Sequence, residues 1–106
     1  MMARVHVAVP DLLFGSKVQS LVVEAGHELV GAPADAEVVV VDLTSDVDRG
    51  LAVLDALPEG ARSLGFFSHV EPEVRERALA AGFDQVVPRS RMNREGGALV
   101  TSLAEG

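Results

Sequence analysis

The sequence predicts an α/β fold in which helices cover both faces of a parallel β-sheet, and three observations carry this prediction. Residues 38–41 are four consecutive valines followed by Asp42, and an unbroken β-branched run is typical of a strand that is buried on both faces. Strand-like and helix-like segments alternate along the chain, as in α/β layer folds. The chain has 106 residues, of which 48% are hydrophobic, so we expect residues 1–106 to form a single domain with a substantial core.

The first half of the chain begins with a strand over residues 5–9, which Pro10 and Asp11 close. A helix is predicted over residues 12–25, with Gly26 in the position that commonly ends a helix. Residues at helical spacing should form its inner face: Leu13, Val18, Leu21 and Val22.

A weak second strand is predicted over residues 28–30 and a strong third strand over residues 36–42. Only six residues, including Pro33, separate Val30 from Glu37. A parallel crossover normally needs a dozen or more residues. We therefore predict that the helix between the second and third strands is missing, and that an extended connection replaces it.

In the second half, Ser45 or Asp46 can cap a helix that ends at Pro58-Glu59-Gly60. Its inward positions are predicted to be Val47, Leu51, Leu54 and Leu57. The remaining elements are a strand over 63–67, a helix from Pro72 to Ala81 stopped by Gly82, a strand over 83–87, a loop over 89–94 and a final helix over 95–104.

Composition excludes several classes of function. The net charge of −7 argues against a nucleic-acid-binding module, which usually carries a basic surface. With no cysteine, the chain has no thiolate metal site or nucleophile. No signal peptide is visible, and the apolar runs are too short to span a membrane. We therefore expect a cytoplasmic protein with no nucleic-acid or membrane partner.

Four segments, in this order and at this spacing, resemble the receiver domain of bacterial two-component response regulators: Ala25–Leu29, Glu37–Leu43, Gly65–His69 and Arg77–Ser90. The resemblance covers nearly the whole chain. It implies a flavodoxin-like sheet with strand order 2-1-3-4-5 and a role in a phosphorelay. It also implies that Asp42 is the phosphoacceptor, that Ser68 contacts the phosphoryl group, and that Mg²⁺ is bound beside Asp42.

The departures from that family are equally informative. The acidic pair that helps receivers to hold Mg²⁺ falls on Val9 and Pro10, and only Asp11, one place later, has a carboxylate. Mg²⁺ prefers oxygen ligands in near-octahedral geometry, so a metal site of Asp11 and Asp42 is incomplete. Arg89 and Ser90 stand where receivers have Lys and Pro. The chain therefore looks like a degenerate receiver, or pseudo-receiver.

Asp42 has two interpretations. It can act as a phosphoacceptor, whose carboxylate attacks an acyl phosphate or phosphohistidine, or it can cap the loop or pair with Arg89 without reacting. Arg89 likewise can clamp a phosphate or carboxylate through its planar guanidinium, or form a structural salt bridge with Asp42 or Asp11. A Ser68–His69–Asp42 triad is not supported, because adjacent side chains of an extended segment point to opposite sides. His27 is expected to be a turn residue on the solvent side.

The resemblance favours a stand-alone, atypical signalling domain that acts by protein–protein interaction, with a partner in trans or by self-association. Its interaction face would be residues 71–104. We expect no enzymatic activity beyond self-phosphorylation at Asp42. The rival hypothesis is a small-anion or nucleotide-binding protein. Its site would be a basic and hydroxyl cluster at the carboxyl ends of the strands: Lys17, Ser68, Arg89, Ser90 and Arg91.

Overall fold

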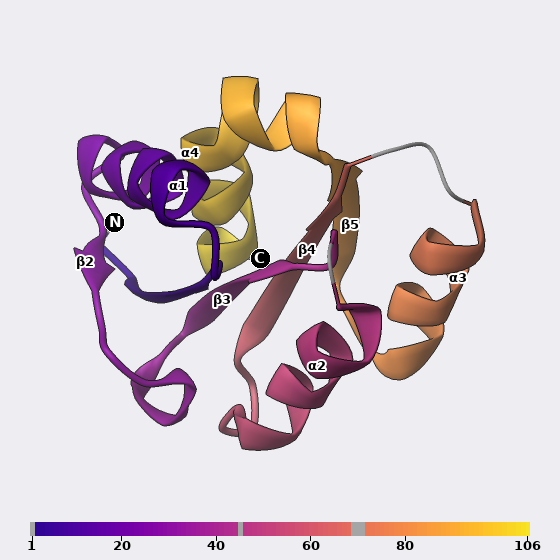
Figure 1. The fold of residues 1–106 in the computed structure, drawn as a ribbon. Coiled ribbons are helices and arrows are strands. Elements are labelled where there is room, and N and C mark those ends of the chain that lie inside the picture. Colours follow the sequence, from indigo (N-terminus) through magenta and orange to yellow (C-terminus); the bar gives the residue numbers. More distant parts are fainter. Residues whose placement is uncertain (1, 45, 69–71) are drawn as a thin grey trace.

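The computed structural model describes residues 2–44, 46–68 and 72–106, and its centre is a five-stranded sheet in which every pair of neighbours is parallel (Figure 1). The strand order is β2-β1-β3-β4-β5, which confirms the predicted flavodoxin-like topology. The strands are β1 (Arg4–Ala8), β2 (Glu28–Leu29), β3 (Val38–Asp42), β4 (Arg62–Phe67) and β5 (Gln85–Pro88).

Helices cover both faces of the sheet, as predicted. Figure 1 shows α1 and α4 on one face, and α2 and α3 on the other. The helices are α1 (Leu12–Glu24), α2 (Val47–Ala52), α3 (Pro72–Ala81) and α4 (Arg89–Glu105). Two short 3₁₀ segments are added, η1 (Pro33–Asp35) and η2 (Val53–Ala56). None of the helices in the described ranges is long and apolar enough to cross a membrane.

Strand β3 divides the hydrophobic core into two layers. It pairs with β1 on one side and with β4 on the other, and every one of its residues is buried. Val38 and Val40 pack into the cluster beneath α1 and α4, whereas Val39 and Val41 pack into the cluster on the α2 and α3 side. The valine run thus supplies both cores in alternation.

The predicted absence of a helix after β2 is confirmed. The connection contains only η1, and Arg4 fixes it by donating from Nε to the carbonyl oxygen of Asp35 at 3.0 Å. On the same face of β1, His6 Nδ1 lies 3.0 Å from the carbonyl oxygen of Val30. Because this face of β1 carries Arg4, His6 and Ala8 rather than large apolar residues, it does not need a covering helix.

The last helix begins earlier than predicted, since residues 89–94 belong to α4 and not to a loop. The pair Gly96-Gly97 suggested a helix start near residue 95. Instead, these glycines let α4 approach α1: a Cβ at Gly97 would lie 3.0 Å from the carbonyl oxygen of Leu21, and one at Gly96 only 3.2 Å from Leu21 Cδ1. The glycines mark close helix packing rather than a helix end.

The prediction that Leu13 faces the core is wrong. Leu13 is 88% exposed and its neighbour Leu12 is 85% exposed. The buried line of α1 runs instead through Phe14, Val18 and Val22, a spacing of four residues that leaves Leu13 off the inner face.

The α2 region also differs from the single helix predicted up to Leu57. The α-helix ends at Ala52, and the 3₁₀ segment η2 continues to Ala56. Asp46 caps α2 by accepting the backbone N–H of Arg49 at 3.0 Å; Ser45, the other predicted cap, lies outside the described residues. The four residues predicted to face inward, Val47, Leu51, Leu54 and Leu57, are half-buried.

His27 is buried and not solvent-facing as predicted, with an exposed fraction of 5%. Its Nδ1 accepts the backbone N–H of Ala3 at 3.1 Å, so Nε2 carries the ring proton and donates to Thr101 Oγ1 at 2.8 Å. The Thr101 hydroxyl in turn donates to the carbonyl oxygen of Gly97 at 3.0 Å. One imidazole thus links the start of β1, the end of α1 and α4.

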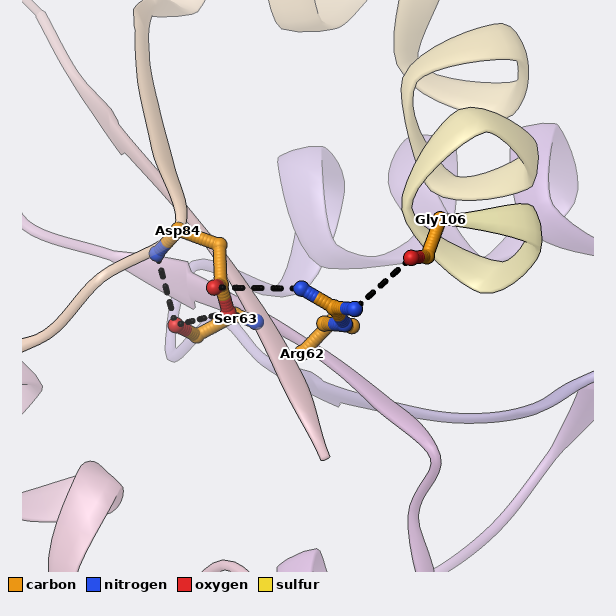
Figure 2. A network of polar contacts seen from close by, with 4 residues as sticks. All are labelled: Arg62, Ser63, Asp84 and Gly106. Carbon is orange, nitrogen blue, oxygen red and sulfur yellow. Dashed lines mark hydrogen bonds and ion pairs between the residues drawn. The ribbon is translucent and has the colours of Figure 1, made fainter. Parts of the chain in front are cut away.

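A second polar network ties the opposite corner of the sheet (Figure 2). Asp84 accepts the backbone N–H of Ser63 at 2.8 Å and lies 3.7 Å from Arg62 Nη1. Arg62 Nη2 donates to the carbonyl oxygen of Gly106 at 2.8 Å. The start of β4 is thereby joined to the segment before β5 and to the end of α4, at the edge of the sheet opposite Asp42.

We expect His27→Leu to lower the free energy of unfolding by about 2–3 kcal/mol, because it leaves the buried N–H of Ala3 without an acceptor and Thr101 without its donor. Urea denaturation followed by circular dichroism measures this change. The neighbouring exposed residue provides the control: Glu28→Ala should change the free energy by less than about 0.5 kcal/mol. Equal effects of the two substitutions would contradict the role of His27.

Candidate functional site

The candidate site lies at the carboxyl ends of the strands, where open α/β sheets bind their ligands. Asp42 ends β3 and is 9% exposed. Its Oδ1 accepts the backbone N–H of Thr44 at 2.7 Å. Asp42 therefore shapes the β3–α2 loop, as one of its two predicted interpretations requires.

Asp11, the carboxylate that follows β1 in the sequence, is already engaged in two interactions. Its Oδ1 caps α1 by accepting the backbone N–H groups of Leu13 at 2.9 Å and Phe14 at 3.0 Å. Its Oδ2 lies 4.0 Å from Arg89 Nη2. The capping geometry fixes this carboxylate at the helix N-terminus.

Arg89 is directed toward α1. Its guanidinium carbon lies 4.0 Å from the centre of the Phe14 ring, a cation–π contact. Phe14 packs edge-on against Phe66 with ring centres 5.2 Å apart, which anchors this platform in the core. Of the two salt bridges predicted for Arg89, the structure contains the one with Asp11, and the ion pairs of the described residues include none with Asp42.

Three of the five residues predicted to bind an anion lie together. Ser68, Arg89 and Ser90 line an open hollow of about 480 Å³, together with Phe14 and Asn93. The other two residues do not line it. Arg91 pairs with Glu95 at 3.4 Å along α4, and Lys17 is exposed on α1. His69, which follows Ser68, lies outside the described residues.

A second cavity, of about 320 Å³, opens beside Asp42 on the α2 side of the sheet. Its walls are mostly apolar, and three charged residues reach it. The lining residues are Ala8, Val9, Pro10, Val41, Asp42, Asp46, Arg49, Gly50 and Val53. Sequence reasoning missed Asp46, Arg49 and Gly50 as site residues. Two features of the sequence could have indicated a cavity here. One is the missing helix, which leaves this side of β1 uncovered, and the other is the small size of Ala8 and Gly50.

No protein-family model matches the sequence, and no curated protein matches it either. Solved structures do match. A response regulator from Thermotoga maritima has a TM-score of 0.80 at 12% identity over 100% of both chains. The receiver domain of Francisella response regulator 1452 has a TM-score of 0.79 at 17% identity over 97% of each chain. The signal receiver domain of a DNA-binding response regulator from Colwellia psychrerythraea 34H has a TM-score of 0.76 at 12% identity, covering 98% of this chain and 99% of that one.

The chain has the receiver-domain fold. The match extends over the whole length, so the resemblance seen in the sequence segments is confirmed at the level of the fold. The receiver fold places Asp42, Ser68 and Arg89 on one edge of the sheet, which is the edge where the predicted phosphoacceptor site would lie.

The residues at this edge of the receiver fold do not fit a Mg²⁺ ion. Val9 and Pro10 line the cavity beside Asp42 and offer no side-chain oxygen. The Asp11 carboxylate is committed to the α1 cap and to Arg89. Within the described ranges, no three acidic or histidine residues come close enough together to hold a metal. Mg²⁺ fills part of its octahedral shell with water and takes one or two carboxylates from a protein. Of the two carboxylates predicted to bind it, Asp11 is held by the α1 cap, so the predicted ligand set is reduced to Asp42.

We expect Arg89→Lys to lower the free energy of unfolding by about 0.5–1 kcal/mol, because an ammonium group cannot stack on Phe14 as a planar guanidinium does. The pair with Asp11 adds little, since both side chains are more than one-third exposed. Urea denaturation tests the prediction. Arg94→Lys on the same helix, where Arg94 is 70% exposed, should change stability by less than about 0.5 kcal/mol; an equal loss there would exclude a specific role for the Phe14 contact.

Proposed function

We propose that residues 1–106 form an atypical receiver-like signalling domain that acts by binding another protein, without efficient phosphorylation of Asp42. The observation that carries this proposal is the chemistry of the Asp42 edge. By their spacing from the first helix, Val9 and Pro10 stand where the resemblance implies the metal-binding acidic pair. Both line the cavity beside Asp42, and the Asp11 carboxylate is held by its helix cap.

Phosphoryl transfer to a carboxylate needs positive charge to stabilise the transferring group. At this edge the charge would have to come from Arg89, which stacks on Phe14 and pairs with Asp11, or from Arg49, which is exposed where it lines the cavity beside Asp42. Asp42 itself accepts the N–H of Thr44 with one oxygen. The site therefore keeps the position of a phosphoacceptor without the groups that would make the reaction fast.

Exposed apolar residues support an interaction role. Leu12 and Leu13 are 85% and 88% exposed in the first turn of α1, two residues after the exposed Pro10. Single exposed leucines are ordinary, but two adjacent ones offer apolar area to a partner. They follow the carboxyl end of β1, at the same edge of the sheet as Asp42. By contrast, the face predicted from the resemblance, residues 71–104, exposes Leu79 at 37% as its one large hydrophobic residue within the described part.

Backbone amide NMR spectra test the proposal most directly. With 10 mM Mg²⁺, and then with added beryllofluoride as a phosphoryl mimic, we expect no saturable shifts at the amides of Asp42, Ser68 and Arg89, because the predicted ligand set is reduced to Asp42. Asp42→Asn gives the matched background spectrum. Saturable shifts at these three amides that disappear in Asp42→Asn would show a working phosphoacceptor site and refute the proposal.

The hollow around Ser68, Arg89 and Ser90 favours a second candidate function, the binding of a small anion. It has two hydroxyl groups, a guanidinium and the N-terminus of α4, which no side chain caps. This function predicts that 10 mM sulfate raises the melting temperature by mass action, and that Arg89→Gln abolishes the rise while Arg94→Gln retains it. Sulfate also stabilises proteins generally, so an equal rise in both variants would exclude a specific site.

A further inference from the structure

The cavity beside Asp42 has an unusual combination of properties. It exists because only η1 follows β2, so no helix covers Ala8 next to α2. Gly50 in its wall lets α2 pack closely on β3, since a Cβ there would lie 2.6 Å from Leu43 Cδ2 and 3.0 Å from the carbonyl oxygen of Asp42. With a volume of about 320 Å³, the cavity is near the lower end of the range for small-molecule sites, roughly 300–1,000 Å³.

The lining combines an apolar wall with a buried negative charge. Six of the nine lining residues are apolar or glycine: Ala8, Val9, Pro10, Val41, Gly50 and Val53. Asp42 is nine-tenths buried in this wall, while Asp46 and Arg49 are exposed at its rim. A buried carboxylate is strongly stabilised by a cation, and burying it alone is unfavourable.

The described residues supply no cation to Asp42. No ion pair among them includes Asp42, and the Asp42 carboxylate accepts a hydrogen bond from the backbone N–H of Thr44. The guanidinium of Arg89 stacks on the Phe14 ring and pairs with the Asp11 carboxylate. Arg49 lines the same cavity, but its guanidinium forms no ion pair within 4.0 Å with Asp42 or Asp46 in the described parts of the chain.

An aliphatic ammonium group matches these features better than a metal does. It has three donors and needs no octahedral set of ligands. Its methylene stem gains free energy from contact with apolar walls while the charged end reaches a carboxylate. The net charge of −7 favours the approach of a cation.

We propose that this cavity receives a lysine side chain of a partner protein, with the methylene stem against Ala8, Val41 and Val53 and the ammonium group against Asp42. The inference rests on the proposed function in one respect, that the occupant belongs to a protein. The exposed Leu12 and Leu13, which follow Pro10 at the rim, would then contact apolar residues that flank the lysine.

The test is an NMR titration of the full ¹⁵N-labelled chain with N-acetyl-lysine methylamide, in buffer without Mg²⁺ or beryllofluoride. We expect saturable shifts at the amides of Ala8, Asp42, Gly50 and Val53. N-acetyl-norleucine methylamide has the same stem without the ammonium group. It should bind with an affinity at least about tenfold lower, which is the equivalent of one charge-assisted hydrogen bond.

Two substitutions complete the design. Asp42→Asn keeps the acceptor for Thr44 and should weaken lysine binding about tenfold or more, whereas Asp55→Asn, an equal charge change at an exposed site on η2, should not. Equal affinity for lysine and norleucine probes, or equal affinity of the two variants, would overturn the proposal. Binding that appears only in Arg49→Gln would also overturn it, because Arg49 would then be the natural occupant of the cavity.

Titration with putrescine distinguishes a lysine side chain of a partner protein from a free amine as the occupant of the cavity. Saturable binding of this free diamine, with no response to the lysine probe, would overturn a protein occupant and leave an amine site. The receiver-like function is tested independently by beryllofluoride, so a negative lysine titration refutes this inference alone.

Discussion

The burial of β3 on both faces is the constraint on which the rest of the molecule depends. Val38 and Val40 are completely buried against α1 and α4, and Val39 and Val41 are buried to 1% exposure or less on the opposite side. A strand of this kind needs a neighbour on each edge and a helix layer on each face. These requirements together fix the parallel sheet, the alternation of elements and the position of Asp42 at the centre of the carboxyl edge.

Much of this architecture could be predicted because it follows from local signals. The valine run, the stop at Gly82 and the six-residue gap before Glu37 are visible in the chain itself. The error at His27 concerns a residue whose neighbours are remote in sequence. His27 is buried because it contacts Ala3 and Thr101, and neither contact can be deduced from residues near position 27.

The same distinction applies to the site. Spacing from the first helix placed Val9 and Pro10 where an acidic pair was expected, and the structure places both beside Asp42. The ion pair of Asp11 with Arg89 was one of the two salt bridges predicted for Arg89, but the spacing gave no sign that Asp11 also caps α1. A carboxylate that lies one position past its counterpart becomes part of a helix terminus, and its lone pairs are then directed at backbone N–H groups. A shift of one residue thus changes a ligand into a cap.

The glycine contact between α1 and α4 makes the packing on the two faces of the sheet different. Gly96 and Gly97 bring α4 so close to α1 that a Cβ at Gly97 would lie 3.0 Å from the carbonyl oxygen of Leu21. On the other side, α2 spans only Val47–Ala52 and meets α3 through an exposed ion pair between Asp48 and Arg77. The close helix contact thus lies on the face of the sheet away from the cavity beside Asp42, which is lined from α2 by Arg49 and Gly50.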